Sequence, residues 1–143
     1  SGDGLARLHA LSAQVRGAIG YAPGHTHAET TAEQAIALGS GVCQDHAHAF
    51  CAAARLLGFP ARYVSGYLLM DDRTEQDATH GWAEAHVTGL GWVGFDVSNG
   101  ISPDERYVRV ATGLDYAEAA PVIGMHFGGA GEEMLVTLAV QQQ

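Results

Sequence analysis

Three residues of the sequence could together perform nucleophilic catalysis. They are Cys43, which follows the glycine-rich stretch Gly39–Val42, His80 in the segment Ala78–Glu84, and Asp96. A thiol must lose its proton to attack a carbonyl carbon, an imidazole can take that proton and give it to a leaving amine, and a carboxylate can orient the imidazole. Because each residue type fills one of these needs, we predict that Cys43, His80 and Asp96 form a catalytic triad.

The position of Cys43 favours the thiolate form that this chemistry requires. We expect a helix that begins at or near Cys43 and ends at Gly58, so the thiol lies where the helix dipole favours negative charge. The predicted apolar stripe of this helix lies on the same side as Cys43 and consists of Ala47, Phe50, Cys51, Ala54 and Leu57. Cys51 is expected to be a small buried hydrophobe. The Cα atoms of the two cysteines would be about 12 Å apart on one helix, which excludes a disulfide between them.

The surrounding pattern predicts two earlier helices and a later sheet. Helical spacing predicts the first helix, with an apolar face of Leu5, Leu8, Leu11, Val15, Ala18 and Ile19. A capping box of Thr30 and Glu33 predicts the start of the second helix, which ends at Gly39. Strands are expected at residues 62–69, 82–87, 92–97, 106–111 and 134–140, the first three as an antiparallel meander. The loop 20–27 could reach over the site, and the loop 71–77 is expected to be solvated or, as an alternative, to select substrate.

The connection between strands 82–87 and 92–97 must meet one condition if the triad is to form. In an antiparallel pair the numbers of opposite residues sum to a constant, and His80 and Asp96 share a face only when this constant is even. An odd-length loop or a β-bulge satisfies the condition, and a three-residue loop centred on Gly89 would place Ser98 opposite His80. Asp96 would then reach His80 diagonally. We predict this geometry, with a hydrogen bond of about 2.6–3.2 Å between the two side chains.

The composition disfavours several classes of partner. With 143 residues, 47% hydrophobic content and 16% charged residues, we expect one catalytic domain over 1–143, excised from a longer chain. Sixteen acidic residues against seven basic ones give a net charge of −9, which disfavours nucleic acid and anionic membranes. Neither a membrane span nor a signal peptide is expected, because no apolar run of about 18 residues is present. Free thiols suit a reducing compartment, so a cytoplasmic location is expected.

Four segments of the sequence carry a resemblance to a known family. They are Gly41–Asp45, Gly58–Tyr67, Thr79–Glu84 and Gly89–Asp96, and further similar stretches follow at 103–108 and 115–117. In type and order these segments resemble the core of the bacterial transglutaminase-like family, whose fold is papain-like. The resemblance implies an α+β fold in which the nucleophile helix packs on an antiparallel β-sheet. It also implies Cys43 as nucleophile, His80 as base and acid, and Asp96 as the residue that orients His80.

The sequence departs from the family pattern at positions that leave the triad intact. Val97 stands where proline commonly follows the aspartate, and Leu114 replaces an expected arginine. His46 stands where an apolar residue is usual. It is interpreted either as a substrate contact near Cys43 or as a partly exposed surface histidine.

Other contacts to substrate are expected around the nucleophile. Gln44 and Trp82 are candidate substrate-binding residues, together with His46. The backbone N–H of Cys43 is the preferred hydrogen-bond donor to the reaction's oxyanion, and Gln44 is the alternative. The expected substrate is a peptide or protein amide.

The sequence leaves open how an acyl-enzyme would be resolved. Water would make the chain a cysteine peptidase or amidase, and a lysine amine would make it an isopeptide-forming transglutaminase. We favour hydrolysis, because water is always available and no acceptor motif is visible. A binding module that keeps the fold without turnover is a further alternative, which the complete triad disfavours.

No metal and no cofactor is expected at the site. The chain has eight histidines, and the pairs His25–His27 and His46–His48 are candidate metal ligands. Residues i and i+2 of a helix point about 200° apart, so His46 and His48 could not bind one ion together. No acidic-loop pattern resembling a calcium-binding EF-hand is present.

Overall fold

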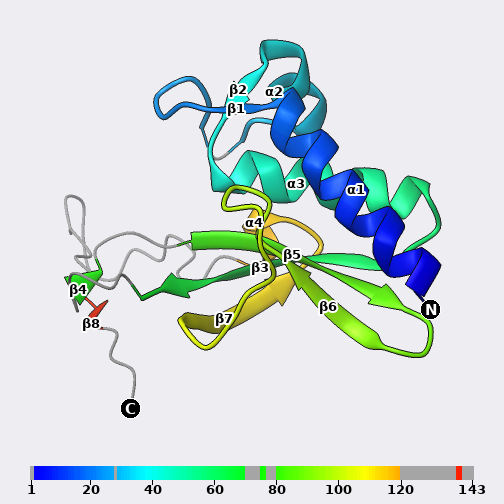
Figure 1. Cartoon of the computed structure of the whole chain (residues 1–143). Coiled ribbons are helices and arrows are strands. Elements are labelled where there is room, and N and C mark those ends of the chain that lie inside the picture. Colours follow the sequence, from blue (N-terminus) through cyan, green and yellow to red (C-terminus); the bar gives the residue numbers. More distant parts are fainter. Residues whose placement is uncertain (1, 28, 70–74, 77–79, 120–137, 140–143) are drawn as a thin grey trace.

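The computed structural model describes residues 2–27, 29–69, 75–76, 80–119 and 138–139. Helices cover one face of a four-stranded antiparallel sheet (Figure 1). The longest helices, α1 (Gly2–Ala18) and α3 (Cys43–Leu56), lie on this face with the shorter α2 (Ala32–Leu38). The predicted α+β class is therefore confirmed, with the nucleophile helix packed on an antiparallel sheet.

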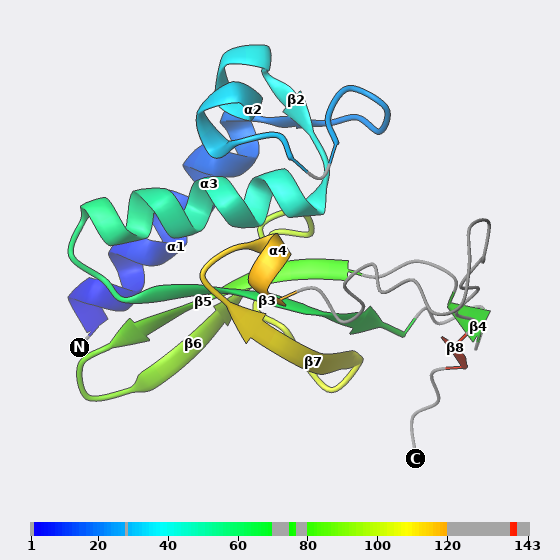
Figure 2. The ribbon, with the colours of Figure 1, turned by 180° about the vertical axis from the view of Figure 1, so that it is seen from behind.

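Helix α3 is the central element of the helical layer, as Figure 2 shows from behind. It begins at Cys43, as predicted, and Gly58 follows its end with φ of 96°, a conformation that favours glycine. Its buried apolar residues include Ala47, Phe50, Cys51 and Ala54. Leu57 was expected to complete this stripe, but it is 45% exposed because the helix has already ended there.

The start of α2 differs by one residue from the prediction. The Thr31 hydroxyl accepts a hydrogen bond from the Gln34 N–H, and the Gln34 side chain accepts one from the Thr31 N–H. The Thr30 hydroxyl instead accepts a bond from the His27 N–H at 3.0 Å, so it closes the preceding turn. The predicted capping box of Thr30 and Glu33 is therefore wrong, although the helix and its left-handed Gly39 cap are as expected.

The main sheet has the strand order β6-β5-β3-β7 and is antiparallel throughout. Its strands are β3 (Ala61–Leu68), β5 (His80–Val87), β6 (Gly91–Phe95) and β7 (Tyr107–Gly113). The first three form the predicted meander, and β7 pairs with the free edge of β3. Strand β5 begins two residues earlier than predicted, so His80 is held by the sheet itself.

The β5–β6 hairpin has the predicted odd-length connection. Val87 pairs with Gly91, so three residues connect the strands, and the Leu90 N–H donates to the Val87 carbonyl at 2.9 Å. Gly89 lies in this turn with φ of 90°, where other residues would be strained. The pairing puts Ala83 opposite Phe95, and the opposite numbers therefore have an even sum.

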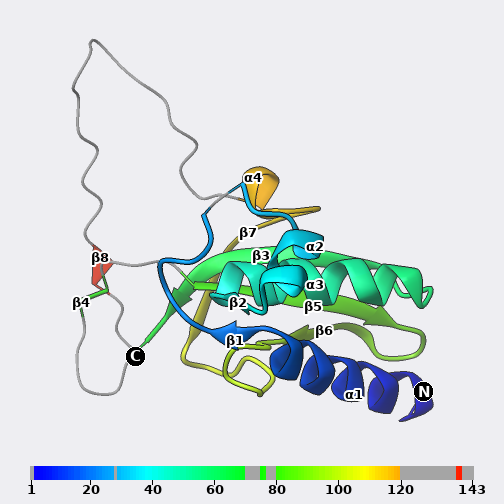
Figure 3. The ribbon, with the colours of Figure 1, turned by 90° about the horizontal axis from the view of Figure 1, so that it is seen from above.

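Two short strand pairs lie outside the main sheet. Strands β1 (Gly20–Tyr21) and β2 (Ser40–Gly41) pair in parallel next to the start of α3, and the sequence analysis did not predict them. Strands β4 (Glu75–Gln76) and β8 (Leu138–Ala139) form an antiparallel pair, and the short helix α4 (Tyr116–Ala119) lies near β7 (Figure 3). The predicted loop 71–77 and strand 134–140 lie largely outside the described residues. In the described part of the chain, no helix is long and apolar enough to cross a membrane.

Candidate active site

His80 and Asp96 are brought together by the β5–β6 hairpin. His80 is the first residue of β5, and Asp96 directly follows β6. Continuing the strand pairing puts Asp96 opposite Trp82 and diagonal to His80, as predicted for a three-residue loop. His80 Nε2 donates to Asp96 Oδ2 at 2.7 Å. The predicted distance between the two side chains is therefore confirmed.

The Asp96 carboxylate is fully buried and hydrogen-bonded by its surroundings. Besides His80, the Tyr107 hydroxyl donates to Oδ2 at 2.5 Å and the Asn99 side-chain amide donates to it at 2.7 Å. Burial alone would raise the pKa of Asp96, but the hydrogen bonds from His80, Tyr107 and Asn99 outweigh it and lower the pKa. Asp96 is therefore a fixed anion behind the imidazole at neutral pH.

The surroundings of His80 favour its protonated form at neutral pH. Burial lowers its pKa, but hydrogen bonds with Asp96 and with the Cys43 side chain, and the charges of both, outweigh burial and raise the pKa of His80 to about 9. Because Asp96 occupies Nε2, Nδ1 is the ring nitrogen left for the Cys43 thiol. His80 can therefore hold a proton beside the Cys43 side chain at neutral pH.

The junction of β2 and α3 holds Cys43 in place. Asp45, in the first turn of α3, is buried, and its Oδ2 accepts hydrogen bonds from the Val42 N–H at 2.8 Å and the Thr26 hydroxyl at 2.6 Å. A Cβ on Gly41 would lie 2.7 Å from this carboxylate, so the close approach requires glycine. Asp45 thus joins the loop 20–27 to the backbone just before Cys43.

Cys51, on the same helix, lies in a different environment. Its side chain is 1% exposed in the core, and burial raises the pKa of its thiol to about 12 although nearby Arg55 acts in the opposite direction. The thiol is therefore protonated and inaccessible at neutral pH. The prediction that Cys51 is a small buried hydrophobe is confirmed.

A cavity of about 610 Å³ opens beside His80. Its walls come from β1, β3, β7 and the turn after Asp96, and they include Tyr21, His80, Ser98, Asn99, Arg106 and Tyr107. Aromatic, polar and apolar side chains all line it, as in sites that bind and orient a small substrate group. A substrate carbonyl in this cavity would lie next to the imidazole.

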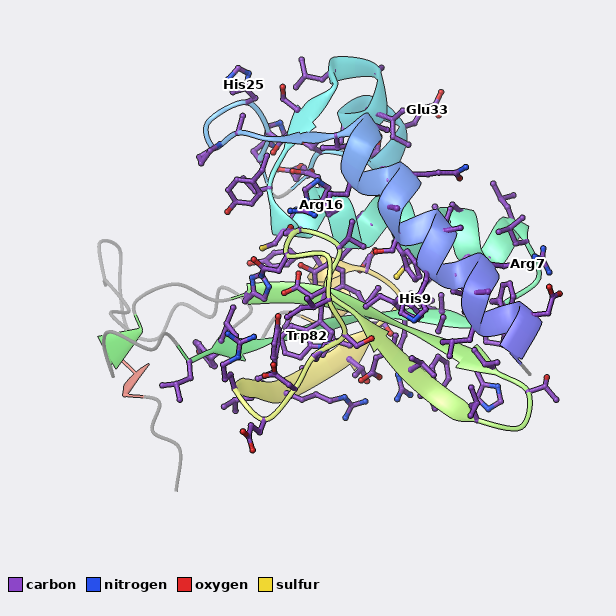
Figure 4. All side chains as sticks on the ribbon, in the orientation of Figure 1. Arg7, His9, Arg16, His25, Glu33 and Trp82 are labelled. Carbon is purple, nitrogen blue, oxygen red and sulfur yellow. The ribbon has the colours of Figure 1, made fainter. Side chains whose placement is uncertain are left out.

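The structure buries two of the three predicted substrate contacts, Trp82 and His46. Trp82, which Figure 4 labels, is 2% exposed. Its ring packs against that of Tyr107 with centroids 5.2 Å apart. It supports the side chains that surround Asp96 and offers no surface to substrate. Gln44 lies half-buried beside Cys43 in the first turn of α3, so its role remains a prediction.

His46 is neither the substrate contact nor the exposed histidine that the sequence analysis expected. It is 1% exposed, and its Nε2 donates to the Ile19 carbonyl at 2.7 Å while Nδ1 bonds the Ser98 hydroxyl at 2.6 Å. The ring therefore joins the end of α1, the start of α3 and the turn that follows Asp96. An apolar residue could fill this space but could not make these two bonds.

The histidines of α3 have separate partners. His48 Nε2 accepts a hydrogen bond from the Tyr116 N–H at 2.9 Å, whereas His46 bonds the Ile19 carbonyl and the Ser98 hydroxyl. This separation agrees with the angular argument against a shared ion. Within the described residues, no three His, Cys, Asp or Glu side chains are grouped as metal ligands.

Three residues at the site were missed in the sequence analysis. Asn99 lies three residues after Asp96, a spacing typical of turns closed by side chains, and this signal could have revealed it. Tyr107 and Tyr21 reach the site from distant strands that carry no local signal of catalysis.

The sequence matches a family profile over the segments that hold these residues. The sequence profile of the transglutaminase-like superfamily matches residues 1–97, which include Cys43, His80 and Asp96. The uncharacterized protein ML0607 of Mycobacterium leprae is 33% identical over 130 residues, covering 87% of this chain and 46% of its own length. The uncharacterized protein Rv2569c of Mycobacterium tuberculosis is 34% identical over 128 residues, covering 82% of this chain and 41% of its own length. The chain thus spans less than half of these relatives.

Solved structures share the fold. A candidate cysteine protease from Cytophaga hutchinsonii superposes with a TM-score of 0.75 and 27% identity, covering 97% of this chain and 46% of that one. LapG of Legionella pneumophila superposes with a TM-score of 0.60 over 82% of this chain and 69% of its own. Its identity of 13% shows likeness of fold alone.

Proposed function

The chain belongs to the transglutaminase-like superfamily, and on that basis we propose that it is a thiol enzyme that attacks an amide or peptide carbonyl. In this proposal Cys43 is the nucleophile, His80 the base and acid, and Asp96 the residue that orients His80. One observation carries it: the buried Asp96 carboxylate holds His80 Nε2 at 2.7 Å, which leaves the opposite ring nitrogen for the Cys43 thiol.

Acylation follows from the protonation states of the triad. The thiol proton passes to His80, and the sulfur forms a bond to the carbonyl carbon while the carbonyl π electrons move to oxygen. When the C=O bond re-forms, the C–N bond breaks, and the leaving amine takes the proton from His80. The product is a thioester on Cys43, and Asp96 stays ionised throughout because its pKa is lowered.

We propose that water resolves the thioester, which would make the chain a cysteine peptidase or amidase. Water can enter the cavity, since Tyr21 on its wall is 60% exposed, and His80 can take a proton from it. The alternative acceptor is a lysine amine, which would give protein-glutamine γ-glutamyl transfer by the same first step. The structural likeness to the candidate cysteine protease of Cytophaga hutchinsonii supports hydrolysis.

The contrast between the two cysteines provides the first test. Cys43→Ala should abolish rapid labelling by iodoacetamide near neutral pH, and it should abolish acyl transfer, because no other described thiol is accessible. The matched control Cys51→Ala should change neither. Mass spectrometry of labelled peptides identifies the modified residue, and rapid modification of Cys51 in the folded chain would refute the assignment.

The acceptor can be determined with a glutamine-containing peptide library. Incubation with and without a lysine donor gives cleavage, deamidation or crosslinked products, each of known mass change. Cleavage or deamidation would support hydrolysis, and crosslinks would support transamidation. Labelled Cys43 with no product of any kind would favour a binding module.

A further inference from the structure

Tyr21 is held beside the nucleophile by backbone pairing. In the parallel β1–β2 pair Tyr21 lies opposite Gly41, two residues before Cys43. The Gly20 N–H donates to the Gly39 carbonyl at 2.9 Å, and the Ala22 N–H donates to the Gly41 carbonyl at 2.8 Å. The chain on both sides of Tyr21 is therefore fixed to the segment that presents the thiol.

The ring of Tyr21 faces the site. It lines the cavity that contains His80, and its centroid is 6.2 Å from that of His46. Because His46 is itself bonded to the Ile19 carbonyl, the ring packs against a fixed surface. Burial, and then the charges of Cys43 and Asp96, raise the pKa of Tyr21, so its hydroxyl keeps its proton at neutral pH.

Two tyrosines line the cavity, Tyr21 and Tyr107, and their hydroxyls differ in their hydrogen-bond partners. The Tyr107 hydroxyl donates to Asp96 and is therefore committed to the triad. The Tyr21 hydroxyl makes no side-chain hydrogen bond to any described residue, and its side chain is 60% exposed within the cavity wall. Tyr21 thus offers a proton donor to a bound group.

We propose that the Tyr21 hydroxyl donates a hydrogen bond to the substrate carbonyl oxygen as the tetrahedral intermediate forms. The inference rests on the proposed thiol mechanism and adds a catalytic residue to it. When the Cys43 sulfur bonds to the carbonyl carbon, the π electron pair moves to oxygen, and the hydroxyl stabilises this oxyanion without transferring its proton. The donor is released when the C=O bond re-forms and the leaving group departs.

The chemistry of two probes tests the proposal. Iodoacetamide alkylates Cys43 by displacing iodide from carbon and forms no oxyanion, whereas p-nitrophenyl acetate acylates it through a tetrahedral oxyanion and releases p-nitrophenolate. Tyr21→Phe should slow the acylation burst on the order of 10²-fold and leave the alkylation rate and the apparent affinity for the ester unchanged. The matched control Tyr116→Phe, which removes a hydroxyl outside the cavity, should change neither rate.

Each outcome has a distinct meaning. An acylation burst that is unchanged in Tyr21→Phe would overturn this inference alone. Equal slowing of acylation and alkylation would also overturn it, because it would show that Tyr21 only positions the thiol. A wild-type chain that is alkylated at Cys43 but never acylated would overturn the thiol mechanism itself.

Discussion

Asp96 Oδ2 accepts hydrogen bonds from three different side chains, and these bonds restrict the orientation and the tautomer of the His80 ring. The bonds from Tyr107 and Asn99 keep the carboxylate from turning, so its acceptor remains aligned with His80 Nε2. A fixed tautomer follows, in which Nε2 carries the proton shared with Asp96. In the proposed mechanism, Nδ1 then exchanges a proton with the thiol. The neighbours of Asp96 thus determine which ring nitrogen of His80 faces away from the carboxylate and could act as the base in the proposed mechanism.

The titration of His80 tests this arrangement at the level of one residue. We expect its NMR resonance to titrate with a midpoint at about pH 9 and acyl transfer to fall as the pH rises through this value, since the leaving amine then loses its proton donor. Asp96→Asn removes an anion that favours the imidazolium, so the midpoint should move to lower pH. A His80→Gln variant assigns the resonance.

The raised pKa of His80 also predicts how the free energy of unfolding changes with pH. The pKa of His80 is raised above its ordinary value of 6.5, so its protonation stabilises the fold fully below that pH, and this contribution is lost as the pH rises through about 9. Asp96→Asn should weaken the pH dependence of the unfolding free energy in this window. A midpoint that is identical in Asp96→Asn and wild type would contradict the role given to Asp96.

At the level of elements, the site depends on the close contact between Gly41 of β2 and Asp45 in the first turn of α3. Gly41→Ala would put a methyl group 2.7 Å from the Asp45 carboxylate. Either Asp45 gives up its bonds to Val42 and Thr26, or the strand moves away from the helix. We expect a loss of about 1–3 kcal/mol in unfolding free energy, together with slower alkylation of Cys43, both measured on the purified variant.

Gly17→Ala is the matched control for this prediction. Gly17 is exposed in the last turn of α1, and no atom outside the helix's own backbone lies within 4 Å of the added carbon, so alanine should stabilise the helix by up to about 1 kcal/mol. The Cys43 alkylation rate should then equal that of wild type. If Gly41→Ala behaves like Gly17→Ala, the close approach of Asp45 does not hold the nucleophile.

The elements with local signals could be predicted from the sequence, and those with distant partners could not. Counting residues across the turn at Gly89 was enough to place Asp96 diagonal to His80, because strand register is a local property. His46 shows the limit: its partners, Ile19 and Ser98, are 27 and 52 residues away, so a buried polar link was interpreted as surface. Tyr107 was assigned to a strand, but only pairing with β3 brings it to Asp96.

The charge of the whole chain predicts a preference among substrates. The net charge of −9 should speed the approach of cationic peptides and slow that of anionic ones. We expect kcat/KM to be higher for a glutamine peptide flanked by lysines than for one flanked by glutamates. The ratio should shrink as ionic strength rises from about 0.01 M to about 0.15 M, where the screening length falls from about 30 Å to about 8 Å. A ratio independent of salt would show that contacts inside the cavity set the preference.

Cys43 and Cys51 lie on one helix but differ in accessibility, because Cys43 is partly exposed and Cys51 is buried. Labelling of the Cys51 thiol can therefore measure local opening around α3. A reagent can reach the buried Cys51 thiol only in the small population of molecules in which the packing around α3 has opened. In a Cys43→Ala background, the labelling rate of Cys51 relative to that of the unfolded chain therefore gives the opening equilibrium under native conditions. A ligand that binds only the closed form of the chain must lower the labelling rate of Cys51 by mass action. The labelling of Cys51 can therefore report whether the candidate active site is occupied, although Cys51 is not part of that site.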